Sequence, residues 1–395
     1  MRRAWRPWRS AERRRRAAGM AECLAIVEPG TSRLRFLVVE TAGGKATVWG
    51  WDDVPGRPDA DAHQLHLACE EMLARTEAMA RDRSERWLEI DQMLVGLPAS
   101  QLLGRASTFT QRRAEPEQAV DGVELETLLG RGLRLAMNRL LDMVPREPGA
   151  GPAKGSTNVA ASLEWLLVDA TIVALTVDGR RVTDPVGFRG EELGATIFVA
   201  LAHAETIDTW RTVAIALEFS TLTLAAAPLA LVQGLSEPQG VLVDVGGETT
   251  DLTLWQAARP VALASLPTGG AALTRALVRT WGLSLDMAER LKQTYARGFL
   301  EEDEERQVQE VMFPVLRAWW EETETRLAQL EMDEALPQWL YLLGGGSALP
   351  DMFEATRALA WSERLHFERY PQVGRIQPHD VPGVVNRTDP VSYTH

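Results

Sequence analysis

The chain has 395 residues, of which 45% are hydrophobic and 25% are charged, as expected for a globular protein with two or more domains. Two cysteines cannot build a disulfide framework, and no apolar leader follows the start, so we expect a reducing, cytoplasmic location. The formal net charge of −13 argues against nucleic acid as the main partner of the folded body.

Residues 1–19 differ from the rest, because eight arginines and one glutamate give them a local charge of +7. Trp5 and Trp8 lie among these arginines, so the segment could tether the protein to anionic lipid headgroups. The alternative is a disordered tail, or a natural start at Met20. We favour this second interpretation, because Pro7 and four consecutive arginines interrupt any apolar helical face.

The stretch from residue 20 to residue 111 begins with a predicted β-meander. The predicted elements are strands over 21–60 with a hairpin turn at Gly43-Gly44, a helix over 61–81 and a strand over 90–97. The first strand ends at Glu28, and the small residues Gly30, Thr31 and Ser32 then form a turn. Glycine lets a backbone approach an anion closely, and amide and hydroxyl groups donate hydrogen bonds to it. We therefore interpret this turn as one half of a phosphate site.

The next stretch, residues 112–203, combines helical and strand patterns. We predict a helix over 123–143, a flexible loop rich in proline and glycine over 145–157, and strands over 163–177 and 195–201. An Asp-Pro-x-Gly turn at 184–187 lies between these strands. A helix over 205–217 is then expected to return the chain to the first domain.

A second strand-turn-strand pattern begins near residue 240 and is the most informative part of the sequence. Its first strand is an apolar run that ends at Asp244. The following turn supplies glycines and hydroxyl groups at Gly246, Gly247, Thr249 and Thr250. Such a turn can cradle phosphate, and the carboxylate at the strand end could hold a magnesium ion through water. Taken alone the pattern is only moderately specific, because a glycine-rich hairpin shows the same letters for conformational reasons.

Two later segments complete a candidate nucleotide site. Glu289 and Lys292 stand three residues apart on one helical face, which suits hydrogen bonds to ribose hydroxyls. A predicted strand over 339–343 then runs into a glycine-rich segment, where a flat base or ribose could lie against bare backbone. The residues of this segment are Gly344, Gly345, Gly346 and Ser347.

The segment near 276–334 is predicted to be a helical insert with an acidic surface. Trp319 and Trp320 lie within it, and we expect them to be buried between helices, since large aromatic residues in helices usually belong to a core. After about residue 375 the chain is polar and punctuated by prolines, so we expect a loose tail over 376–395.

Four elements carry a resemblance to a known fold: the two strand-turn-strand patterns, the helix with Glu289 and Lys292, and the glycine-rich segment over 344–347. In this order they resemble the ATPase fold shared by actin, the DnaK-type chaperones and the sugar kinases. Two further stretches sharpen the resemblance. Residues 266–274, which include Gly269 and Gly270, look like the segment that follows the second phosphate loop in the bacterial cell-division protein FtsA. Residues 177–193 combine Val-Asp-Gly, Asp-Pro-x-Gly and Gly-x-x-Leu patterns and are similar to the extra 1C subdomain of FtsA. The chain therefore resembles FtsA over about residues 21–370.

The resemblance implies an α/β protein with the two-lobed, actin-like (ribonuclease H-like) ATPase fold. Its expected parts are a first lobe over 20–111 and 204–238, an FtsA-type 1C subdomain over 112–203, and a second lobe over 239–375. ATP or ADP with magnesium would bind between the lobes. Both turns, with Gly269 and Gly270, would contact the phosphates, while Glu289, Lys292 and residues 344–347 would hold the adenosine.

Three positions depart from the pattern of the resembled family and argue against rapid hydrolysis. Glu28, followed by Pro29, stands where aspartate is expected. Ala227 stands where the resemblance would put a water-orienting glutamate, and alanine can neither orient nor deprotonate water. Glu248 replaces a third glycine, and it would repel phosphates if it points inward but be harmless if it points outward. We therefore expect slow or absent turnover, with nucleotide setting the interdomain geometry.

FtsA-like proteins form filaments and recruit the tubulin-like protein FtsZ, so the resemblance implies a cell-division scaffold that interacts with FtsZ and with itself. The C-terminal amphipathic helix of the family has no counterpart here, so contact with the inner face of the membrane at the division site would be indirect or through residues 1–19. The first alternative is a PilM-like assembly protein of type IV pili, which would bind a short peptide of a membrane partner. The second is a small-molecule kinase on the same fold, although no motif for a base or substrate pocket stands out.

Overall fold

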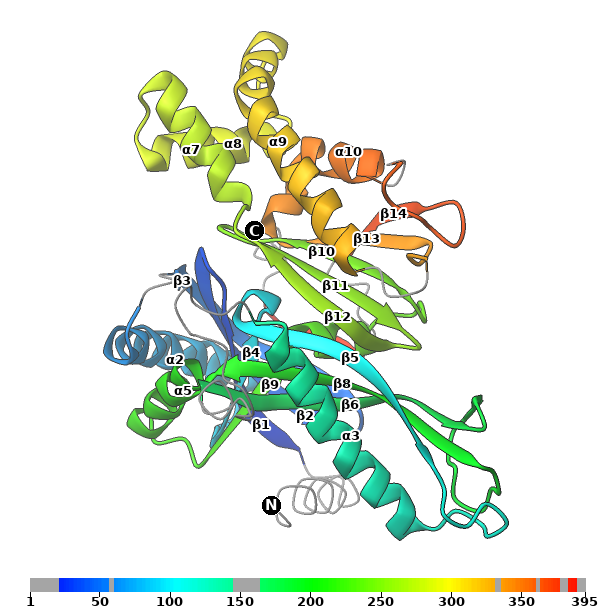
Figure 1. The fold of residues 1–395 in the computed structure, drawn as a ribbon. Coiled ribbons are helices and arrows are strands. Elements are labelled where there is room, and N and C mark those ends of the chain that lie inside the picture. Colours follow the sequence, from blue (N-terminus) through cyan, green and yellow to red (C-terminus); the bar gives the residue numbers. More distant parts are fainter. Residues whose placement is uncertain are drawn as a thin grey trace.

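The computed structural model describes residues 21–56, 60–144, 164–330, 335–359, 363–376 and 383–388. Within these residues the chain forms two sheets in two lobes, and a ribbon of long strands with helix α3 (Gly122–Asp142) extends from them (Figure 1). The expectations for the basic segment 1–19 and for the loop over 145–157 fall outside the described residues.

The first lobe contains a six-stranded sheet in the order β15-β3-β2-β1-β4-β9. Its strands are β1 (Glu22–Pro29), β2 (Arg33–Ala42), β3 (Lys45–Pro55), β4 (Gln92–Leu97), β9 (Thr221–Ala226) and β15 (Val384–Asn386). Strands β1 to β3 form an antiparallel meander, and β4 and β9 run parallel to β1. Buried residues alternate with less buried ones along β1 and β4, so that one face of the sheet belongs to the core.

Helices cover this sheet. They are α2 (Ala62–Ser84), α5 (Ala204–Ala216) and α6 (Ala227–Gln233), with a 3-10 turn η1 (Ala99–Gln101) after β4. Helix α2 begins where the carboxylate of Asp61 accepts a hydrogen bond from the amide of Gln64, as is usual for an aspartate N-cap. Helices α2 and α5 lie side by side (Figure 1), and their fully buried Met72 and Trp210 contribute to the core of the lobe.

The second lobe repeats this pattern. Its strands are β10 (Gly240–Val245), β11 (Thr250–Gln256), β12 (Arg259–Leu266), β13 (Trp339–Leu343) and β14 (Gln372–Arg375). Strands β10 to β12 form an antiparallel meander, and β13 and β14 run parallel to β10. The two lobes thus have the same strand order and the same strand directions, as the prediction of an actin-like fold requires.

The helices of the second lobe lie on the side of its sheet away from the first lobe (Figure 1). They are α7 (Gly270–Trp281), α8 (Leu285–Ala296), α9 (Glu302–Leu330) and α10 (Pro350–Leu359), with a 3-10 turn η2 (Gly345–Ala348). On α9 the expected burial of Trp319 is confirmed, because it is 0% exposed, while Trp320 is half-buried against the core. No helix in the described ranges is long and apolar enough to cross a membrane.

The ribbon extends the second sheet to nine strands in the order β14-β13-β10-β11-β12-β5-β8-β6-β7. The added strands are β5 (Leu102–Arg112), β6 (Trp165–Val177), β7 (Arg180–Val182) and β8 (Glu192–His203). Strand β5 pairs with β8 along its whole length but meets β12 only at Arg105 and Ala262. Helix α3 packs on this ribbon and closes a second hydrophobic core. The boundary expected at residue 112 is therefore the last residue of a strand that already belongs to the ribbon.

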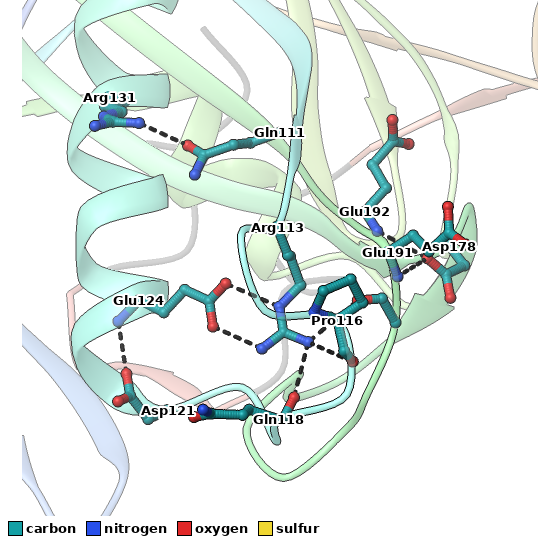
Figure 2. Close-up of polar contacts among 11 residues, drawn as sticks. Gln111, Arg113, Pro116, Gln118, Asp121, Glu124, Arg131, Asp178, Glu191 and Glu192 are labelled. Carbon is teal, nitrogen blue, oxygen red and sulfur yellow. Dashed lines mark hydrogen bonds and ion pairs between the residues drawn. The ribbon is translucent and has the colours of Figure 1, made fainter.

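Arg113 joins the loops at the end of β5 (Figure 2). Its side chain is 2% exposed. The guanidinium donates two hydrogen bonds of 2.8 Å to the carboxylate of Glu124. It also donates to the carbonyl oxygens of Pro116, Gln118 and Gly190, at 3.3, 2.9 and 3.1 Å. Because a buried guanidinium needs partners for its donors, these bonds hold α3, the loop before it and the loop before β8 together.

The Val-Asp-Gly pattern of this ribbon has a conformational role. Asp178 lies in the left-handed region with φ of +48°, and its carboxylate accepts hydrogen bonds from the amides of Glu191 and Glu192 (Figure 2). In the Asp-Pro-x-Gly turn, the carboxylate of Asp184 accepts from the amide of Val186. Aspartate is suited to both positions, because its short side chain bonds to nearby backbone amides.

The loose tail expected over 376–395 is wrong for the part of it that the structure describes. Val384–Asn386 form β15, which pairs in parallel with β3 of the first lobe. The amide of Ala46 also donates to the carbonyl oxygen of Gly383, and the amide of Arg387 donates to that of Val48. The physical reason is that β3 would otherwise be an edge strand with unpaired backbone groups, which a short segment with two valines can satisfy.

The packing of α3 gives a test with an internal control. A Cβ at Gly132 would lie 1.8 Å from two ring carbons of the buried Phe109, whereas a Cβ at Gly130 would meet nothing within 4 Å. We expect Gly132→Ala to lower the free energy of unfolding by about 1–3 kcal/mol through overpacking. Gly130→Ala should raise it by about 0.5–1 kcal/mol, since alanine favours the helix. Urea denaturation followed by circular dichroism measures both, and equal effects would contradict this packing.

Candidate functional site

The two turns predicted to bind phosphate, one from each lobe, lie against each other. The backbone amide of Glu248 donates a hydrogen bond of 3.0 Å to the hydroxyl of Thr31. A Cβ added to Gly247 would lie 1.5 Å from Oγ of Ser32, so the approach depends on glycine. The turn after β1, which starts at Gly30, and the turn after β10 are therefore neighbours across the boundary between the lobes.

The first residues of α7 hold the second turn in place. The amides of Gly270 and Ala271 donate to the carbonyl oxygens of Gly246 and Gly247, at 2.9 and 2.8 Å. A Cβ at Gly269 would lie 2.5 Å from the carbonyl oxygen of Gly247. Glycine at this position therefore allows the start of the helix to reach the backbone of the turn.

The triple glycine after β13 reaches the same region, because β13 pairs in parallel with β10. Gly344 has φ of +81°, and a Cβ there would lie 2.2 Å from Oδ1 of Asp244. Gly346 is buried, whereas Gly345 is exposed at the start of η2. The hydroxyl of Ser347 donates a hydrogen bond of 2.7 Å to the carbonyl oxygen of Gly344 and so stabilises the turn.

Glu289 and Lys292 form an ion pair of 2.8 Å on α8. The ammonium of Lys292 also donates to the carbonyl oxygen of Gly270 and to the hydroxyl of Thr274, at 3.1 and 2.7 Å. Burial raises the pKa of the Glu289 carboxyl, but the charge of Lys292 and the hydrogen bonds outweigh it, so that the net direction is downward. A Cβ at Gly270 would lie 3.8 Å from Cα of Gly346, so the ion pair stands beside the glycines of both segments.

Thr250 lies deeper than the rest of the second turn. It is fully buried, and its hydroxyl donates to the carbonyl oxygen of Thr268 and accepts from the indole nitrogen of Trp319, at 2.7 and 2.8 Å. Its hydroxyl therefore connects the turn to α9 inside the lobe. Thr249 is half-buried in the turn itself, and its carbonyl oxygen accepts from the amide of Gly246.

The acid at the end of β1 is paired within the protein. Glu28 stands directly opposite Arg35 in the register of β1 and β2, and Nη1 of Arg35 lies 3.0 Å from both carboxylate oxygens. Burial lowers the pKa of Arg35, but the negative charges of Glu28, Asp244 and Asp53 together raise it by more than burial lowers it. The net shift of the pKa is upward, so the guanidinium stays charged. The side chains are 45% exposed for Glu28 and 31% for Arg35, and thus remain accessible.

The acid at the end of β10, Asp244, is in a different environment. Burial raises the pKa of its carboxyl to about 7, and the charges of Asp251 and Glu28 raise it too, while Arg35 opposes them. Among the described residues, no group of three or more acidic, histidine or cysteine side chains is placed to hold a metal ion. Because Glu28 is bound by Arg35 and Oδ1 of Asp244 packs against Gly344, these acids do not fit a magnesium site.

Asp251 is a buried acid at the boundary between the lobes that the sequence reasoning missed. It is 7% exposed, and its carboxylate accepts hydrogen bonds from the amide of Ser100 and the hydroxyl of Ser265, at 3.0 and 2.7 Å. Ser100 belongs to η1 of the first lobe, so this carboxylate ties the lobes together. The signal was available in the sequence, because an acid inside an otherwise apolar strand needs buried partners.

Glu248 points toward a partner on its own lobe. Its two carboxylate oxygens lie 2.8 and 2.7 Å from Nη1 of Arg275 on α7. The charge that replaces a third glycine in the turn is thus compensated by an arginine, and this pairing offsets the repulsion that an unpaired Glu248 would exert on an anion.

Ala227 is the first residue of α6 and follows β9 directly. Strands β1, β4 and β9 are parallel, so their C-terminal ends lie at one edge of the sheet, where the turn after β1 also lies. A methyl group therefore stands at the same edge of the sheet as the turn after β1.

Comparison with known proteins supports this architecture. The family model described as "Cell division protein FtsA" matches residues 241–383, which is less than half of the chain. Among solved structures, one titled "PilM-PilN type IV pilus biogenesis complex" has a TM-score of 0.62 and 17% identity, covering 95% of this chain and 94% of that chain. A search of curated proteins found no match.

Two further structures are more distant. The ethanolamine utilization protein EutJ from Carboxydothermus hydrogenoformans has a TM-score of 0.45 and 14% identity, over 90% of this chain and 84% of that chain. MreB 5 of Spiroplasma citri bound to AMPPNP has a TM-score of 0.38 and 10% identity, over 89% and 91%. The predicted α/β class and the two-lobed, actin-like fold are confirmed.

The environment of Asp244 predicts a pH-dependent cost of folding. Its carboxyl has a pKa of about 7 in the folded protein and about 3.9 when unfolded, so the folded state binds the proton more tightly. Stability is then lost as the pH rises from about 4 to about 7 and changes no further above that. Asp244→Asn should therefore raise the free energy of unfolding relative to the unmodified protein. This increase should grow from about pH 4 to about pH 7 and stay constant above that. Urea denaturation at a series of pH values measures the difference, and a gain independent of pH would contradict it.

Proposed function

We propose that this protein is a nucleotide-binding scaffold, which holds ATP or ADP between its lobes and uses it to set their relative geometry. One observation carries the proposal. Segments that are far apart in the sequence, namely both turns, the start of α7, the ion pair on α8 and the triple glycine, meet in one region between the lobes. Bare backbone and charged donors at one place are what a nucleoside polyphosphate needs.

The proposed contacts follow the position of each segment. Backbone amides and hydroxyls of Thr31, Ser32, Gly247 and Thr249 would face the phosphates. Gly30 and Gly246 would shape the two turns, because their amides already donate to the carbonyl oxygens of Glu28 and Thr249. Glu289 and Lys292 would hold the ribose, and residues 344–347 would lie against the adenine. Thr250, Gly269 and Gly270 would act by supporting the second turn, because their own polar groups are already engaged or packed against it.

Binding of phosphate would be coupled to the relative position of the lobes. The hydroxyl of Thr31 and the amide of Glu248 bond to each other, and Ser32 packs on Gly247. Phosphate oxygens would have to take over these donors, which separates the two turns. A nucleotide thereby favours one interlobe geometry, by its differential affinity for the open and closed arrangements.

Turnover is proposed to be slow or absent. Ala227 supplies no group that could orient or deprotonate a water molecule at the edge of the cleft. Both carboxylate oxygens of Glu28 accept from Arg35, so this acid is engaged within the protein. The ligand would therefore act as a structural switch rather than as a substrate.

The proposed partners are an FtsZ-type division protein and further copies of this chain, at the inner face of the cell membrane. The family model that matches the second lobe supports this role. The alternative, a PilM-like role, is favoured by the similarity of nearly the whole chain to the structure titled "PilM-PilN type IV pilus biogenesis complex". In that case the partner would be a short peptide of a membrane protein.

Equilibrium titration with ATP and ADP tests the nucleotide part of the proposal. Lys292→Ala removes the ammonium that holds the backbone of Gly270 and the carboxylate of Glu289, and should weaken ATP binding by about tenfold. Arg290→Ala, on the same helix but in an exposed pair with Asp286, is the matched control and should bind normally. No binding by the unmodified protein at millimolar ATP would refute the nucleotide role. Rapid phosphate release would refute the switch.

Partner choice is tested by binding assays with purified proteins. Immobilised protein with ATP should retain FtsZ and should sediment as a polymer if the division role holds. Retention of a short peptide of a pilus membrane protein, without retention of FtsZ, would decide for the alternative.

A further inference from the structure

Arg35 places a fixed positive charge beside the first turn. It stands opposite Glu28 in an antiparallel pair, so both side chains project from the same face of the sheet. Nη1 of Arg35 lies 3.0 Å from each carboxylate oxygen of Glu28. The carboxylate of Glu28, which could otherwise bind a hydrated cation, is therefore already neutralised by the guanidinium of Arg35.

The second acid, Asp244, lies at the equivalent strand end of the other lobe. Its Oδ1 packs so closely against Gly344 that a Cβ there would lie 2.2 Å away. Burial lowers the pKa of Arg35, and the negative charges of Glu28 and Asp244 raise it. In turn, the charge of Arg35 lowers the pKa of Asp244.

We propose that Arg35 takes the place of the divalent cation in this cleft, so that the protein binds the polyphosphate of a nucleotide without magnesium. This inference rests on the proposed nucleotide-binding function. It concerns which positive charge neutralises the polyphosphate.

The chemistry of the two cations favours this arrangement. Magnesium requires a near-octahedral set of oxygen ligands and is usually held by one or two carboxylates besides the phosphates. Here one carboxylate is bound by a guanidinium and the other is packed against backbone. A guanidinium is always charged, and its planar fork of donors matches the oxygens of a phosphate. An incoming polyphosphate would compete with Glu28 for Arg35, instead of recruiting a metal ion to both acids.

Calorimetric titration of the full chain with ATP, in EDTA and in excess magnesium chloride, tests the inference. We expect the dissociation constants in the two buffers to agree within about threefold, because magnesium contributes little in the cleft. Binding that is lost in EDTA and restored by magnesium would overturn the inference while leaving the nucleotide function intact. Absence of binding in both buffers would overturn the proposed function, and the inference with it.

Variants of the ion pair give a second, independent readout. Arg35→Ala should weaken ATP binding in EDTA by about tenfold or more, and magnesium should then restore part of it, because Glu28 is released. Glu28→Gln should strengthen binding in EDTA, since the glutamine competes less for Arg35. Arg35→Lys keeps the charge and should lose less affinity than Arg35→Ala.

The matched control is Arg75→Ala, which removes an arginine of the same lobe that is paired with Asp52 and Glu71 on β3 and α2. It should leave both dissociation constants unchanged. Thermal unfolding without ligand shows whether each variant is folded. If folded Arg35→Ala bound ATP in EDTA as tightly as the unmodified protein, Arg35 would have no role in place of the cation.

Discussion

The close approach of backbone to backbone at the second turn is the constraint on which the rest of the site depends. A side chain at Gly247 would strike Ser32 of the other lobe, and one at Gly269 would strike the carbonyl oxygens of the turn. Glycine removes both obstacles, so the amides of Gly270 and Ala271 can hold the turn while its far side meets the first lobe. The position of the turn then fixes where Asp244 and Glu248 lie.

Charge compensation is the second organising feature of the cleft. Four acids near the turns have partners within the protein: Glu28 pairs with Arg35, Glu248 with Arg275, Glu289 with Lys292, and Asp251 accepts from two hydrogen-bond donors. Such pairing reduces the repulsion that bare carboxylates would exert on phosphate. The same pairing reduces the attraction of these acids for a free divalent cation. This agrees with the proposal that the site binds a nucleotide without magnesium.

The fold distributes these tasks between regions. The two repeated sheets supply the turns, and α7, α8 and α9 support the second turn from outside through Gly270, Lys292 and Trp319. The ribbon of β5, β6, β7 and β8 has a core of its own beneath α3 and is closed at its end by Arg113. The core of the ribbon is therefore separate from the core beneath the two turns.

The sequence by itself determined the strand-turn-strand pairs, the helical insert with a buried Trp319, and the glycines, because periodicity and backbone freedom are local properties. Only the tertiary structure decided which charges meet. Arg35 faces Glu28, Glu248 faces Arg275, and Asp251 reaches Ser100, through pairings that depend on register and on the placement of the lobes. The pairing of β15 with β3 also depended on the tertiary structure, since a three-residue segment becomes a strand only where it meets an open sheet edge.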